Sequence, residues 1–190
     1  YKVSANAPED DALIVDIRDE ADFKKNHIPG SINIMATSDT SKFETWLGSI
    51  VRPEEKFHVV VDSMENAEKI LQRTAKIGYE VNVKSIFTLG EKEMEKSDKL
   101  NLEDFKENEK KYTIVDIRND SEVAEGKIFE SAIAIPLHQL REKSDEIPTD
   151  KPIVVHCAGG YRSAAGFSIL EKELNSKNVF DLSQDIEKFK

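Results

Sequence analysis

The residue types best suited to chemistry surround a single cysteine. Cys157 follows the β-branched apolar run 153–156, which is typical of a buried strand. Gly159 and Gly160 come next, and apolar residues then recur at helical spacing. Glycines let successive backbone N–H groups point inward at a helix start, and such a nest favours negative charge. Helix N-termini and nearby arginines also lower a thiol pKa from about 8.5 to roughly 3.5–7.5. We therefore interpret Cys157 as an activated nucleophile rather than a small buried hydrophobe.

Length, charge and cysteine content limit the possible functions. A chain of 190 residues can form one medium domain or two small ones. The net charge of −10 and the lack of a basic stripe argue against nucleic acid or a membrane surface as partners. No apolar run approaches the roughly 18–20 residues that span a bilayer. One cysteine cannot form an intramolecular disulfide, which favours a reducing compartment, the cytoplasm.

An internal repeat predicts two units of one plan. The segment Ile-Val-Asp-Ile-Arg occurs twice, a hundred positions apart. The repeated segments are 14–18 with 114–118, 27–34 with 127–135, and 57–62 with 152–157. We therefore expect domains at residues 1–95 and 96–190. The last alignment places Asp62 where the second unit has Cys157.

Each unit alternates short apolar strands with helical segments, which predicts an α/β fold with an open, mainly parallel sheet flanked by helices. The expected strands are residues 13–17, 31–34, 57–61 and 84–87, then 113–117, 132–135, 153–156 and 178–181. The expected helices are residues 20–25, 41–47 and 65–77, then 121–125, 137–143 and 162–174. The polar stretch 91–111 should hold the boundary and one further helix. Ligands bind outside the carboxyl ends of strands in such sheets, and Cys157 falls at one of these ends.

Three features together resemble the rhodanese (thiosulfate sulfurtransferase) family. They are the Val-Asp-Ile-Arg strand ends, the His-Ile-Pro-Gly-Ser turn at 27–31, and the strand–cysteine–loop–helix element around Cys157. The resemblance covers nearly all of both units and implies two rhodanese-like domains in tandem. The loop 157–163, Cys-Ala-Gly-Gly-Tyr-Arg-Ser, is similar to that of proteins that fuse a metallo-β-lactamase-fold persulfide dioxygenase to rhodanese units. This similarity implies that the chain is the carboxy-terminal part of such a fusion, with that domain as its covalent partner.

The resemblance implies a sulfurtransferase that uses no cofactor and reacts by double displacement. Cys157 would take the outer sulfur of thiosulfate or of a low-molecular-weight persulfide and pass it to a thiol or another nucleophile. The loop residues expected to bind substrate, through backbone N–H groups and one cation, are Ala158, Gly159, Gly160, Tyr161, Arg162 and Ser163. Arg162 would contact an anionic donor or close the loop by donating to carbonyl groups. For Ser163 we expect helix capping, and Tyr161 would shape access or pack on the surface.

Several residues are expected to be structural. Asp116 and Arg118 would form part of the scaffold, since both recur in the first unit. Arg118 with Glu122, like Arg18 with Asp22, has the i, i+4 spacing of a local ion pair. No His and Asp cluster has metal-ligand spacing, so no metal is expected. The residues interpreted as structural or as surface residues are His27, His58, His138, His156 and Lys127.

Two alternatives remain open. Phosphatases and arsenate reductases also use a cysteine thiolate in a ring of backbone N–H groups, and this is the first alternative. Cys157 and Arg162 have the spacing Cys-x4-Arg, however, which is one residue shorter than the Cys-x5-Arg loop of tyrosine phosphatases. Arsenate reduction would ordinarily need further thiols. The second alternative is a non-catalytic binding module. This suits the first unit, which is expected to be inactive because the carboxylate of Asp62 cannot carry sulfane sulfur.

Overall fold

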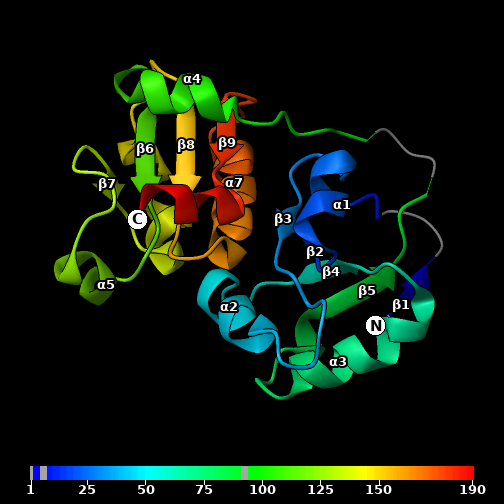
Figure 1. The fold of residues 1–190 in the computed structure, drawn as a ribbon. Coiled ribbons are helices and arrows are strands. Elements are labelled where there is room, and N and C mark those ends of the chain that lie inside the picture. The colour runs from blue at the N-terminus through cyan, green and yellow to red at the C-terminus, as the bar shows by residue number, and fades with distance from the viewer. Residues whose placement is uncertain (1, 5–7, 91–93) are drawn as a thin grey trace. The chain divides into compact units, whose positions relative to one another are not determined.

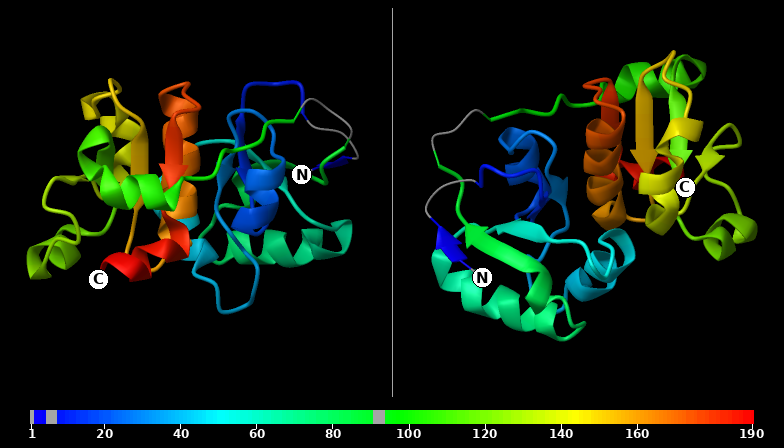
Figure 2. Two further views of the ribbon diagram at one scale, coloured as in Figure 1. Left: turned by 45° about the horizontal axis from the view of Figure 1, so that its top comes forward. Right: turned by 180° about the vertical axis from the view of Figure 1, so that it is seen from behind.

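The computed structural model describes residues 2–4, 8–90 and 94–190 (Figure 1). The chain forms two compact units, residues 1–96 and 97–190, so the division lies one residue from the expected boundary. In each unit a parallel sheet carries helices on its faces, as the alternating pattern predicted (Figures 1 and 2). Within the described residues, no helix is both long enough and apolar enough to span a membrane.

Unit 1 is built on a parallel five-stranded sheet in the order β1-β5-β4-β2-β3. The strands are β1 Lys2–Ser4, β2 Leu13–Asp16, β3 Ile32–Asn33, β4 Phe57–Val60 and β5 Val83–Phe87. The helices are α1 Glu20–Lys25, α2 Phe43–Ile50 and α3 Ala67–Ala75. The sequence pattern did not predict β1, a short edge strand that pairs only with β5.

Unit 2 repeats this plan with a parallel four-stranded sheet in the order β7-β6-β8-β9. The strands are β6 Thr113–Asp116, β7 Ile133–Ala134, β8 Ile153–His156 and β9 Val179–Asp181. The helices are α4 Leu102–Glu107, α5 Asp120–Glu125, α6 Leu140–Lys143 and α7 Tyr161–Glu173. A 3-10 segment, Ser183–Phe189, ends the chain and was not predicted. In Figure 1 this red segment lies at the carboxyl ends of β6 and β8.

Both faces of the second sheet are buried, which explains why β8 reads as a continuous apolar run. On one face α7 packs against β8 and β9. The other face holds a cluster in which Phe105 of α4 contacts Phe129 and Phe189 edge-on, with ring centroids 5.7 and 5.5 Å apart. The strand carrying Cys157 is thus held rigidly between two layers.

The sheet register corrects the alignment of the two units. Leu13 pairs with Phe57 in unit 1 as Thr113 pairs with Ile153 in unit 2. Asp16 therefore pairs with Val60, and Asp116 with His156. The residue in the place of Cys157 is the next one, Val61, and not Asp62 as the sequence alignment predicted.

Candidate active site

The loop 157–160 joins β8 to α7, which begins at Tyr161, at the carboxyl edge of the second sheet. The backbone N–H of Gly160 donates a hydrogen bond to Cys157 Sγ at 3.1 Å. Gly160 has φ +97°, a conformation that side chains disfavour, and it is the N-cap of α7. The helix that follows is long enough for its N-terminal dipole to stabilise a thiolate. Of the loop N–H groups predicted to form a nest, the structure thus shows that of Gly160 directed at Sγ.

The Cys157 thiol is buried beneath this loop. Cys157 is only 1% exposed, while Gly159 is exposed and Tyr161 and Arg162 are half-buried. The structure thus places Cys157 at the bottom of the loop and not at its surface.

Ser163 has a different role from the helix cap that was expected. Its fully buried hydroxyl donates to the carbonyl of Gly160 at 2.8 Å. The N-cap of α7 is Gly160, which makes no side-chain capping bond. Ser163 therefore fastens the first turn of α7 to the loop and fixes the peptide next to the Gly160 N–H.

Arg162 is held by a carboxylate from another helix. Its Nη1 and Nη2 atoms donate to the two carboxylate oxygens of Glu122 at 2.5 and 2.6 Å. Glu122 also accepts from the backbone N–H of Asn119 at 3.0 Å, as part of the capping box of α5. This one carboxylate therefore joins α5 to α7. The sequence did not reveal the pair, because its members lie forty positions apart.

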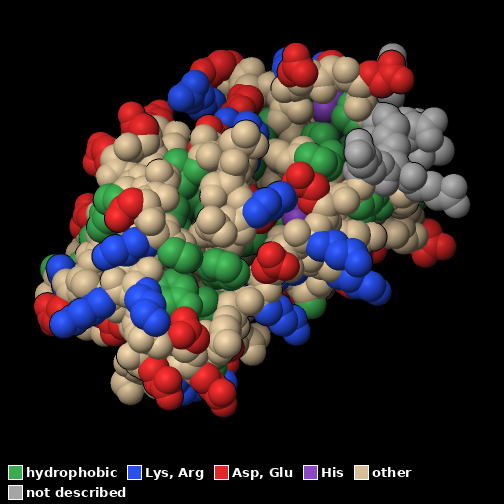
Figure 3. Space-filling model, turned by 90° about the horizontal axis from the view of Figure 1, so that it is seen from above, with side chains coloured by type: hydrophobic (Ala, Val, Ile, Leu, Met, Phe, Trp, Pro, Cys, Tyr) green, Lys and Arg blue, Asp and Glu red, His purple; other side chains and the backbone are tan. Residues whose placement is uncertain are grey.

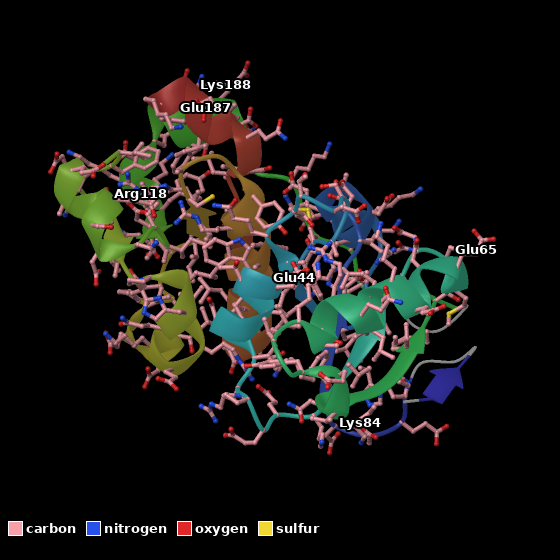
Figure 4. The ribbon with its side chains drawn as sticks, turned by 90° about the horizontal axis from the view of Figure 1, so that it is seen from below. Glu44, Glu65, Lys84, Arg118, Glu187 and Lys188 are labelled. Atoms are coloured by element: carbon pink, nitrogen blue, oxygen red, sulfur yellow. The ribbon has the colours of Figure 1, made fainter. Side chains whose placement is uncertain are left out.

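The expected ion pairs of the strand-end arginines are wrong. Arg118 donates to both oxygens of buried Asp116, with Nη2 at 2.7 Å, and reaches only the backbone carbonyl of Glu122. Arg18 pairs in the same way with Asp16 at 2.7 Å. Each arginine pairs with the buried aspartate because a carboxylate removed from water needs a charged partner more than an exposed carboxylate does. Figure 4 shows Arg118 near α5, and its scaffold role is as expected.

The charges near the loop shift one another's pKa. The hydrogen bonds from Arg162 lower the pKa of Glu122 to about 2. The same bonds raise the pKa of Arg162, and the charged form of Cys157 raises it further. Cys157, the Arg162 guanidinium and the Glu122 carboxylate therefore interact as one group.

Replacing Glu122 with glutamine should destabilise unit 2 by about 1 kcal/mol near neutral pH, a figure reduced for partial exposure of the pair. The folded-state pKa of Glu122 is lowered, so its stabilisation is present above the unfolded pKa of about 4.3 and is lost as pH falls toward 2. Urea unfolding of both proteins between pH 6 and pH 3 should show the difference shrinking with acidity. A difference that stays constant over this range would contradict the prediction.

Three of the four histidines are buried, and the fourth, His138, is exposed. His156 is fully buried, and burial lowers its pKa, which keeps the ring neutral. Its Nε2 lies 3.7 Å from Asp116 Oδ2 without a hydrogen bond. His58 contacts Ser85, and His27 contacts the carbonyl of Phe23. Lys127 is exposed and donates to a neighbouring carbonyl. Among the described residues, no cluster of His, Cys, Asp or Glu could hold a metal ion.

The matching loop of unit 1 has different chemistry. Val61, which is 1% exposed, takes the place of Cys157, and exposed Asp62 takes the place of Ala158. A short 3-10 turn, Met64–Asn66, then leads into α3. Figure 4 shows Glu65 pointing away from this end of α3. The loop therefore offers neither a thiol nor a basic side chain.

Comparisons with known proteins agree with this architecture. A family profile described as rhodanese-like domain matches residues 2–88 and 101–190. The uncharacterized protein YqhL of Bacillus subtilis (strain 168) is 36% identical over 73 residues, 38% of this chain and 57% of that protein. A protein named sulfurtransferase from Allochromatium vinosum is 40% identical over 50 residues, 26% of this chain and 46% of that protein. The matches thus span about half the length of these relatives.

Two solved structures show the same kind of likeness. A rhodanese-related protein from Thermoplasma volcanium is 38% identical, with a TM-score of 0.39, over 44% of this chain and 80% of that one. The 3-mercaptopyruvate sulfotransferase SseA of Escherichia coli is 16% identical, with a TM-score of 0.39, over 91% of both chains. The family profile covers nearly all of both units, and the chain therefore belongs to the rhodanese family, with two rhodanese-like domains in tandem.

Proposed function

We propose that unit 2 is a sulfurtransferase that carries sulfane sulfur on Cys157. The observation that supports this most directly is the Gly160 N–H pointing at Cys157 Sγ from the start of α7. The same donor that stabilises the thiolate would stabilise the negative terminal sulfur of a persulfide. A relative named sulfurtransferase is consistent with this activity.

The proposed reaction has two displacement steps. The Cys157 thiolate attacks the outer sulfur of the donor, the donor S–S bond breaks, and its electron pair leaves with sulfite or with a thiolate. The resulting persulfide then gives its terminal sulfur to an acceptor thiolate or another nucleophile, which regenerates the Cys157 thiolate. Both steps conserve atoms and electrons without a cofactor. We propose thiosulfate or a low-molecular-weight persulfide as donor and a thiol as acceptor, in the cytoplasm.

Unit 1 is proposed to be a non-catalytic scaffold. Val61 lies where the nucleophile would be, and an aliphatic side chain can neither attack nor carry sulfur. The acidic side chains of Asp62 and Glu65 would in addition repel an anionic donor.

A metallo-β-lactamase-fold domain is proposed as a covalent neighbour in the full-length protein. The support is the similarity of the loop 157–163 to those of persulfide dioxygenase–rhodanese fusions. The mass of the protein isolated from its native cells would test this. A mass of 21.5 kDa, that of the present chain alone, would contradict it.

Incubation with thiosulfate, and separately with a thiol persulfide, should add the mass of one sulfur atom to the chain. Intact-mass spectrometry followed by peptide mapping should place the adduct on Cys157, because the chain contains no other cysteine. Addition of excess thiol should remove it. An unchanged mass with both donors would overturn the proposed function. A phosphoryl adduct after incubation with a phosphate ester would instead support the phosphatase alternative.

A further inference from the structure

The positive charge of Arg162 is neutralised by the carboxylate of Glu122. Arg162 and Glu122 are joined by two short hydrogen bonds, and their side chains are only 13% and 31% exposed. A bidentate guanidinium–carboxylate pair is both strong and fixed in orientation. The capping bond from Asn119 holds the Glu122 carboxylate from its other side. Glu122 therefore engages both terminal nitrogens of Arg162, and the guanidinium also interacts with Cys157.

A second arginine at this end of the sheet, Arg118, is also paired. Its guanidinium donates hydrogen bonds to Asp116 and to the carbonyl of Gly126. The charges at the loop then sum to about −1 when Cys157 is a thiolate, because Glu122 cancels Arg162. The face drawn in Figure 3, at the opposite end of the second sheet from the loop, shows acidic and basic side chains interspersed.

This charge balance treats the two donor classes differently. Thiosulfate carries two negative charges and is repelled by the negative charge of the Cys157 thiolate, because Glu122 already cancels the positive charge of Arg162. A thiol persulfide in its neutral RSSH form meets no such repulsion. We propose that Glu122 is a specificity-determining residue that favours thiol persulfides over dianionic thiosulfate as donors to Cys157. This inference rests on the sulfurtransferase function proposed above.

The favoured step balances without a further reactant. The Cys157 thiolate attacks the terminal sulfur of RSSH, and the S–S bond of the donor breaks. The departing thiolate takes the donor's proton, so the products are the enzyme persulfide anion and RSH. Glu122 touches neither reacting sulfur in this scheme. It acts through Arg162, as a positioning residue.

The test compares single-turnover rates of persulfide formation on Cys157 with two donors, thiosulfate and the persulfide of 2-mercaptoethanol. Glu122→Gln keeps the side-chain length and an oxygen that can accept from Asn119, but it removes the negative charge. We expect the rate constant with thiosulfate to rise about tenfold, since one charge is removed near a dianion. The rate with the persulfide, which carries at most one negative charge, should change less than threefold by the same reasoning. The gain with thiosulfate should shrink at 1 M salt, where the screening length is about 3 Å.

Two further variants control the result. Glu125→Gln makes the same change of charge at an exposed position of α5 and should leave the donor ratio as in the wild type. Glu122→Asp retains the negative charge and should retain the wild-type preference. A Glu122→Gln variant that alters both donor rates equally, or no more than Glu125→Gln does, would overturn the inference. Wild-type protein that forms no persulfide with either donor would overturn the proposed function itself.

Discussion

Changing Cys157 to serine is expected to lower sulfur transfer by more than about 1,000-fold, because loss of the nucleophile removes the covalent route altogether. A hydroxyl is nearly the same size as a thiol, but it does not ionise near neutral pH and cannot form a persulfide. The buried site should accept the change, since the Gly160 N–H can donate to oxygen as well as to sulfur. Formation of thiocyanate from thiosulfate and cyanide measures the loss, and circular dichroism checks the fold.

The matched control lies in the corresponding loop of unit 1. Asp62→Asn alters an exposed residue of the loop that has Val61 at the cysteine position. We expect it to leave the rate unchanged, because unit 1 provides no nucleophile. Persistent transfer in Cys157→Ser would show that sulfur is carried elsewhere. A large loss in Asp62→Asn would show that unit 1 takes part in the reaction.

Local patterns were sufficient to predict most of the helices and strands. The expected helix at residues 20–25 is α1, and the expected strand at 153–156 is β8, both with the predicted bounds. Each has a strong local signal: an Asp19 cap precedes α1, and β8 is an unbroken β-branched run. The segment Ser183–Phe189 was missed because its few apolar residues, such as Ile186, acquire their burial only from the distant Phe105 cluster. Figure 4 shows Glu187 and Lys188 on this segment.

The register error has a physical cause. Every residue of β4 is buried, so its sequence lacks the alternation of apolar and polar residues that would reveal a shift of the alignment by one position. Only the pairing of Asp16 with Val60 decides it. The conclusion about unit 1 survives the correction, since neither valine nor aspartate is a sulfur carrier.

The site itself was predictable only in part. Cys157, the glycines and Arg162 were predicted because they lie close together in the sequence, and the structure brings the Gly160 amide to Sγ. The partner of Arg162 was not found, because Glu122 comes from another helix and its spacing from Arg118 suggested a local pair instead. The Cys157 thiol is also more deeply buried than its predicted position at the end of a strand suggests. A buried cysteine whose neighbouring amides pointed away would have contradicted the nucleophile hypothesis, but the Gly160 amide points toward it.

Gly160→Ala should be the most damaging of the small substitutions in the loop. A Cβ at this position would lie 2.9 Å from the backbone nitrogen of Gln184 and from the carbonyl carbon of Ser183, neither of which can rotate away. The conformation at φ +97° is itself strained for any side chain. Together these effects should destabilise unit 2 by about 3 kcal/mol. Relief of the clash would move the Gly160 N–H away from Sγ, with an expected loss of about 100-fold in the transfer rate.

Gly159→Ala provides the comparison, because it adds the same methyl group one residue earlier. A Cβ there meets nothing within 4 Å, and the residue is exposed. We expect a change in stability within about 0.5 kcal/mol and a transfer rate close to that of the wild type. Urea unfolding and single-turnover persulfide formation should therefore separate the two alanine variants. Equal losses in both would mean that bulk anywhere in the loop is harmful. The assigned role of the Gly160 amide, and with it the stabilised thiolate, would then lose its main structural support.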